Sequence, residues 1–125
     1  MDTTPNLTLP YIMAAQAQKH VTHNEAIRAL DALVQLSVID RDLSSPPASP
    51  VNGARYIVPA GAGGAWAGQE SKIAAYQDGA WSFYQMAEGW LAWVADEDAL
   101  VVWNGAAWVA VGGGGGGGVA SVNPV

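Results

Sequence analysis

Two groups of side chains in this chain have residue types and spacings that could bind a metal ion. His20 and His23 are three residues apart, so a helix would place both of them on one face. No third ligand stands nearby in the sequence, and we interpret the pair as polar residues at a helix entrance. Asp96, Glu97 and Asp98 offer the oxygen ligands that Ca²⁺ prefers, but they lack the glycine and the distal glutamate of an EF-hand loop. We interpret these carboxylates as the solvated acidic tip of a hairpin.

Other catalytic patterns give weaker signals still. One tight loop cannot easily place two carboxylates across a substrate, so a Ca²⁺-dependent hydrolase is only a remote alternative. The stretch Gly61-Ala62-Gly63-Gly64 is followed by no Lys-Ser/Thr pair, and no serine stands in a nucleophile elbow. The chain has no cysteine, which removes thiol nucleophiles and thiolate metal sites. We therefore predict no catalytic residues, no metal and no cofactor, and a protein that is not an enzyme.

The tryptophans are the remaining candidates for function. Six of them stand among 125 residues, and a Trp side chain can fill a core, anchor a protein interface or stack on a sugar ring. We favour a core or a subunit interface for most of them. If the chain binds sugar, Trp66, Trp90 and Trp93 are the predicted stacking residues.

Composition limits the possible partners. A length of 125 residues indicates one domain. The net charge of −6 and five scattered basic residues argue against nucleic acid, whose phosphates require clustered Lys and Arg. No run approaches the roughly 20 apolar residues of a membrane span, and Met1–Pro5 lacks the pattern of a signal peptide. We expect no membrane partner, and we expect synthesis and assembly in the cytoplasm.

The elements that must position these residues begin with an extended arm, which we place at residues 1–20. Thr22 and Glu25 have the spacing of a capping box and predict a helix from about Thr22 to Ala32, followed by a strand through Asp40. The alternative is a helix that continues to Ile39. Apolar residues recur at helical spacing along this segment: Ala26, Ile27, Leu30, Leu33 and Val34.

The second half of the chain has hairpin signals. Asp78-Gly79 favours a tight turn between Lys72–Gln77 and Ala80–Tyr84, with Tyr76 opposite Trp81 and Ala74 opposite Phe83. Trp90–Ala95 and Leu100–Trp103 should pair around the acidic tip, and Asn104-Gly105 should turn the chain into Trp108–Val111, with Trp103 and Trp108 on one face. We predict an α+β fold in which one N-terminal helix packs on a small antiparallel meander or barrel-like sheet. The single domain covers residues 21–111, and residues 112–125 form a flexible Gly-rich linker or tail.

Several segments together resemble a phage-derived domain family, originally of unknown function, that occurs in head-spike and tail-fibre-like proteins of bacteriophages and gene transfer agents. The most specific segment is the Gln18-Lys19-His20 and Asn24-Glu25 block. The resemblance extends from about Leu7 to Val111 and is carried by Leu9–Ala26, Leu30–Gln35, Pro46–Pro50, Arg55–Val58, Ala65–Gly68 and Asp78–Trp81.

The resemblance implies a structural virion component, as a base or adaptor of a head spike or fibre that attaches a distal receptor-binding part. Its expected partners are other copies of itself, as a pentamer or trimer, and other capsid, spike or fibre proteins of a phage-like particle. Leu7, Leu9, Tyr11 and Ile12 of the arm are then predicted to contact the oligomer or the particle. The rival interpretation is a carbohydrate-binding module for host capsular polysaccharide.

Overall fold

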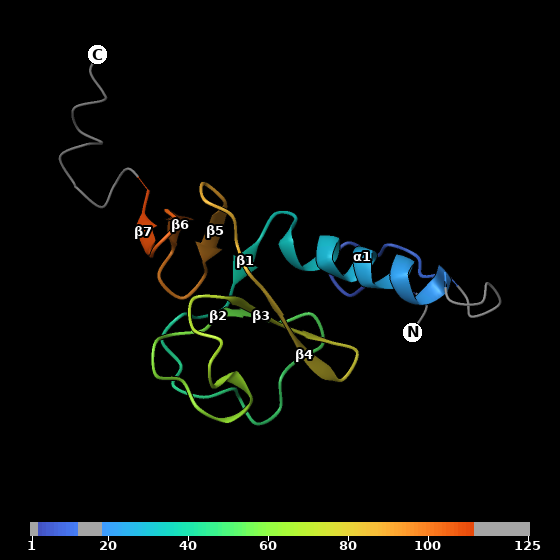
Figure 1. The fold of residues 1–125 in the computed structure, drawn as a ribbon, viewed down its shortest axis with the longest axis horizontal. Coiled ribbons are helices and arrows are strands. Elements are labelled where there is room, and N and C mark those ends of the chain that lie inside the picture. Colours follow the sequence, from blue (N-terminus) through green and yellow to red (C-terminus); the bar gives the residue numbers. More distant parts are fainter. Residues whose placement is uncertain (1–2, 13–18, 112–125) are drawn as a thin grey trace, which may run out of the picture.

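The computed structural model describes residues 3–12 and 19–111, which form a helix and two small sheets (Figure 1). The α+β class predicted from the sequence is confirmed. The predicted tail at residues 112–125 and the last part of the predicted arm, residues 13–18, lie outside the described residues. None of the described helical segments is long and apolar enough to cross a bilayer. The elements are α1 (Lys19–Leu33), β1 (Ser37–Val38), β2 (Arg55–Ile57), the 3-10 turn η1 (Gly64–Trp66), β3 (Ile73–Gln77), β4 (Ala80–Tyr84), β5 (Leu91–Val94), β6 (Ala99–Trp103) and β7 (Trp108–Ala110).

The strands are divided between two sheets rather than joined in the one continuous meander we expected. Four strands lie in the order β1-β5-β6-β7, and three lie in the order β2-β3-β4. β1 pairs with β5 in parallel, whereas the neighbouring pairs in both sheets are antiparallel. The segment after β1 passes from one sheet to the other: the Ile39 amide donates to the Arg55 carbonyl at 2.8 Å, and the Ile57 amide donates to the Asp40 carbonyl at 3.2 Å.

The hairpin predictions are confirmed in position and register. Tyr76 pairs with Trp81, and Asp78 and Gly79 have φ angles of 52° and 89°, as a turn with two left-handed central residues requires. Trp103 lies opposite Trp108, and their ring centroids are 5.5 Å apart. These paired aromatic side chains help to fix the register of each hairpin.

Two apolar clusters form the core. The larger cluster lies between the sheets and consists of the buried residues Leu36, Val38, Ile57, Ile73, Met86, Ala92, Val94, Val101 and Trp103. The smaller one lies on the other face of the three-stranded sheet, where Trp66 packs with Ala54, Tyr56, Val58 and Ala74. The three-stranded sheet is therefore covered on both faces, whereas the core covers only one face of the four-stranded sheet.

The helix begins earlier than predicted and the following strand is shorter. Lys19 is already helical, so Thr22 and Glu25 lie inside α1, where both are exposed. The predicted capping box is therefore wrong, because an exposed Thr and Glu three residues apart within a helix have the same spacing as a cap. α1 ends at Leu33, which contradicts a helix running to Ile39, and within the predicted strand only Ser37–Val38 is extended.

Candidate functional site

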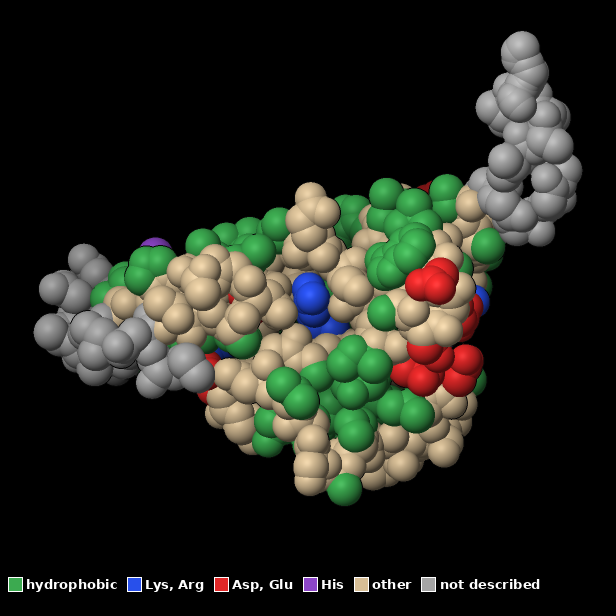
Figure 2. Space-filling model, turned by 180° about the vertical axis from the view of Figure 1, so that it is seen from behind, with side chains coloured by type: hydrophobic (Ala, Val, Ile, Leu, Met, Phe, Trp, Pro, Cys, Tyr) green, Lys and Arg blue, Asp and Glu red, His purple; other side chains and the backbone are tan. Residues whose placement is uncertain are grey.

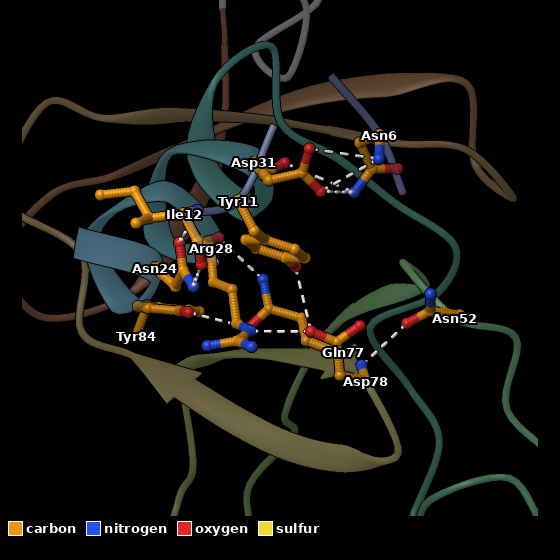
Figure 3. A network of polar contacts seen from close by, with 10 residues as sticks. All are labelled: Asn6, Tyr11, Ile12, Asn24, Arg28, Asp31, Asn52, Gln77, Asp78 and Tyr84. Atoms are coloured by element: carbon orange, nitrogen blue, oxygen red, sulfur yellow. Dashed lines mark hydrogen bonds and ion pairs between the residues drawn. The ribbon is translucent and has the colours of Figure 1, made fainter. Parts of the chain in front are cut away.

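The buried face of α1 carries two polar side chains beside Ile27 and Ala32, and the N-terminal arm binds to these polar groups (Figure 3). Asp31 is fully buried, and its carboxylate accepts hydrogen bonds from the Asn6 amide, the Asn6 side chain and the Leu7 amide. About two helical turns before Asp31, the Asn24 side chain accepts a hydrogen bond from the Ile12 amide at 2.9 Å and donates one to the Ile12 carbonyl at 3.0 Å. A buried carboxylate and a buried amide are stable here because the backbone of the arm satisfies them.

A second polar group joins the arm and the helix to the β3–β4 turn. Arg28 Nε donates to the Asp78 carboxylate at 2.8 Å, and the Tyr11 hydroxyl donates to the same oxygen at 3.0 Å. The guanidinium carbon of Arg28 lies 4.9 Å from the centre of the Tyr11 ring. Burial acts to raise the pKa of Asp78, but the hydrogen bonds from Arg28 and Tyr11 outweigh it and hold that pKa below its ordinary value.

The arm residues predicted to contact other subunits therefore lie on their own domain. Leu7, Leu9, Tyr11 and Ile12 are each half-buried. Tyr11 and Ile12 are also held by hydrogen bonds to Asp78 and to Asn24, respectively. These contacts lie within one protomer and do not test whether the accessible part of the four side chains also touches another subunit, so that assignment stays a prediction.

The apolar face of α1 points away from the body of the protein. Leu30 is 52% exposed and Val34 is 41% exposed, whereas Asn24, Asp31 and Ala32, which lie further round the helix, are buried. Ile27, at the border between the two faces, is also buried. We call the exposed face the apolar stripe of α1, defined by Ala26, Ala29, Leu30, Leu33 and Val34. Together with Trp90, these residues line a groove of about 500 Å³ that has no charged side chain in its wall.

The uncovered face of the four-stranded sheet continues this apolar surface. It exposes large side chains from all three of its longer strands and from the residue after β7, namely Leu91, Trp93, Leu100, Val109 and Val111. A second groove, of about 490 Å³, is bounded by Trp93, Leu100 and Leu33, and Leu33 also lines the groove beside Trp90. Figure 2 shows hydrophobic side chains along one edge of the molecule, from the helix to this sheet. We call the stripe, Trp90 and this sheet face together the assembly surface.

The tryptophans named for sugar binding do not share one environment. Trp66 is fully buried and packs against Tyr56 and Trp81, with ring centroids 5.5 and 5.4 Å away. The prediction that Trp66 stacks on sugar is wrong, because a ring that is enclosed in the core has no face open to a sugar. Trp90 and Trp93 are 46% and 41% exposed and both lie on the assembly surface.

The acidic tip is exposed at Asp96, Glu97 and Asp98, as the sequence predicted, but it also has neighbours from the segment after β1. Asp96 lies with Asp40 and Asp42, and carboxylate oxygens of the three residues are all within 4.8 Å of one another. Sequence reasoning missed this grouping, because the parallel β1–β5 pair brings together residues more than fifty positions apart. Glu97 instead forms an ion pair with Arg41 at 2.9 Å, and that hydrogen bond lowers the pKa of Glu97. His23 is exposed on α1 and belongs to no possible metal-binding group among the described residues.

Comparison with known proteins adds one finding to this geometry. A family model described as a protein of unknown function (DUF2793) matches residues 23–109, which include most of α1 and both sheets. Among curated proteins, none matched the chain.

Proposed function

We propose that this chain, which belongs to the DUF2793 family, is a structural subunit that forms a symmetric homo-oligomer in a phage-like particle or gene transfer agent. Its role there is that of a base or adaptor of a head spike or fibre, which attaches a distal receptor-binding part. The resemblance of the Gln18–His20 and Asn24–Glu25 block to head-spike and tail-fibre-like proteins supports the particle and its location in the virion. Partners are other copies of the chain and the neighbouring capsid, spike or fibre proteins.

The observation that carries the proposal is the assembly surface. A helix of a soluble domain ordinarily turns its apolar stripe towards the core and its polar residues towards water. α1 departs from this arrangement: Ile27 and Ala32 are buried, but so are Asn24 and Asp31, and the large apolar side chains of Leu30 and Val34 stay exposed. Contiguous exposed apolar surface of this kind is typical of protein–protein interfaces, because leaving it in water costs about 25 cal/mol per Å².

An experiment with two matched variants tests the proposal. Leu30→Glu places a charge in the apolar stripe, whereas Val21→Glu places the same charge on an equally helical and exposed apolar position. The two residues are nine positions apart, which is two and a half helical turns and therefore the opposite side of α1. We expect light scattering after size-exclusion chromatography to show a defined oligomer for the original chain and for Val21→Glu, and a protomer for Leu30→Glu. The dissociation constant of the Leu30→Glu oligomer should be raised at least about 100-fold.

A protomer that stays single at high micromolar concentration would contradict assembly. Localisation is tested separately by cryo-electron microscopy of intact particles, in which density for this domain should occupy a spike or fibre base. Particles that lack the chain and keep all their appendages would contradict the adaptor role.

Carbohydrate binding remains the second candidate, because Trp93 borders a groove that also contains the polar side chains of Gln35 and Ser37. Stacking on an aromatic ring flanked by hydrogen-bonding groups is a common way to hold a sugar. Titration with host capsular oligosaccharides distinguishes the two: a saturable change in Trp fluorescence that Trp93→Ala abolishes would favour glycan recognition.

A further inference from the structure

We propose that copies of this chain assemble by parallel, side-by-side packing of α1 around a common rotation axis, with the apolar stripe of each helix against that of the next. This inference rests on the proposed function, since it names the surface and the direction by which the proposed oligomer forms. The occupant of the groove beside Trp90 is then α1 of a second copy.

The spacing of the stripe fits a helix with the same spacing. Ala26, Leu30 and Leu33 follow one another at intervals of four and three, the pattern of the contact positions in helices that pack side by side. Ala29 and Val34 flank them. A second copy supplies the same pattern, and the two alanines leave room for a partner helix at the usual interaxial distance of about 8–10 Å.

The distribution of polarity along α1 sets the direction of packing. All members of the stripe follow Glu25, whereas the exposed residues before it include Thr22 and His23. An antiparallel partner would lay its Thr22 and His23 against the apolar groove and leave much of each stripe uncovered. A parallel partner places stripe against stripe, and the polar half of one helix meets the polar half of the next.

The rest of the assembly surface agrees with this direction. Leu33 borders both grooves, so the stripe passes without interruption into the uncovered face of the four-stranded sheet. Parallel packing about one axis brings that face of each copy towards the same axis, and Trp90 and Trp93 become covered in the same step. Neither groove is lined by a charged side chain, so protomers with a net charge of −6 can meet there without placing like charges in contact.

Cysteine cross-linking tests the arrangement, and the natural absence of cysteine makes every introduced thiol unique. In parallel packing, Ala26→Cys faces the equivalent position of its neighbour, so mild oxidation or a short bis-maleimide linker should join most of the protein into covalent dimers. A disulfide requires the two Cα atoms to approach within about 7 Å, which makes the reaction selective. Val21→Cys, on the opposite side of the same helix, is the matched control and should stay largely monomeric on a non-reducing gel.

A third variant separates the failure of this inference from the failure of the proposed function. If an intact oligomer cross-links through Leu100→Cys on the sheet but not through Ala26→Cys, the parallel helix arrangement is wrong and the structural role stands. Equal cross-linking of Val21→Cys and Ala26→Cys also overturns the arrangement. If light scattering finds a lone protomer at every concentration, both proposals fall together.

Discussion

At the scale of single residues, a few polar side chains decide which way α1 faces. Asp31 and Asn24 bind the backbone of the arm, and Arg28 binds both Tyr11 and the turn residue Asp78. Gln77 adds a hydrogen bond to the Arg28 carbonyl at 2.7 Å. A polar group buried without its partner costs free energy. The helix therefore cannot rotate its apolar stripe inward without breaking these hydrogen bonds.

The ion pair at the turn predicts a pH-dependent stability. Because the folded pKa of Asp78 lies below its ordinary value, its contribution is fully present above the unfolded pKa of about 3.9 and is lost as the pH falls through the folded pKa. Asp78→Asn keeps a residue that tolerates the left-handed φ. The pair is partly exposed, so we expect the variant to be less stable by no more than about 1 kcal/mol at pH 6.

Urea unfolding at pH 6 and at pH 3 or below measures this contribution. The difference between the original chain and Asp78→Asn should shrink as the pH falls below 3.9. The matched control is Asp98→Asn, at another left-handed hairpin position with a φ of 52°. If the difference in unfolding free energy stays constant across this pH range, the charge of the Asp78 carboxylate does not stabilise the contacts among Tyr11, Arg28 and the β3–β4 turn.

At the scale of elements, the turns fix the strands. Gly79 has a φ of 89°, and a Cβ atom added there would meet no atom within 4 Å. Gly79→Val should therefore destabilise the domain by about 1–2 kcal/mol through backbone strain alone. Ala80→Val is the control, because it adds the same side chain at an exposed strand position that favours β-branched residues. Thermal unfolding should show a lower midpoint for Gly79→Val only, and equal midpoints would contradict the turn assignment.

The sequence predicted those elements whose cause is local. Asp78-Gly79 and the facing pair Tyr76 and Trp81 identify a hairpin because two adjacent left-handed residues are rare outside such turns. The division into two sheets was not predictable in this way. It depends on Ser37 pairing with Trp93, and no short-range pattern encodes a parallel contact between residues so distant in the chain.

The candidate site was half predictable for the same reason. The spacing of Leu30, Leu33 and Val34 indicates an apolar stripe, but not the side to which it turns. That side depends on Asp31 and Asn24, whose partners lie in an arm that the sequence marks only as extended. Burial of Trp66 likewise depends on a loop that folds over the three-stranded sheet, which composition does not reveal.

At the scale of the whole molecule, the exposed tryptophans should report the covering of the assembly surface. Trp90 and Trp93 are partly open to solvent in the protomer, whereas Trp66 is fully buried within it. We expect acrylamide to quench the fluorescence of Leu30→Glu, a protomer, more strongly than that of the original chain at the same concentration. Dilution of the original chain should raise its quenching to the level of the variant.

The double variant Trp90→Phe and Trp93→Phe serves as the control for this measurement. It should retain the fluorescence of the buried rings and lose the part of the quenching that depends on concentration. Quenching that is identical in the original chain and in Leu30→Glu would mean that these two rings are not covered by association.

The hydrogen-bonded arm also has a consequence for the order of folding and association in the proposed oligomer. Because α1 is held by contacts within one chain, the protomer can complete its fold while the apolar stripe of α1 is still exposed. Maturation of the subunit is then a first-order process that proceeds at any dilution, and only the later joining of subunits responds to how many have accumulated. In the proposed oligomer, folding and association are therefore separate steps, and folded protomers can accumulate before they associate.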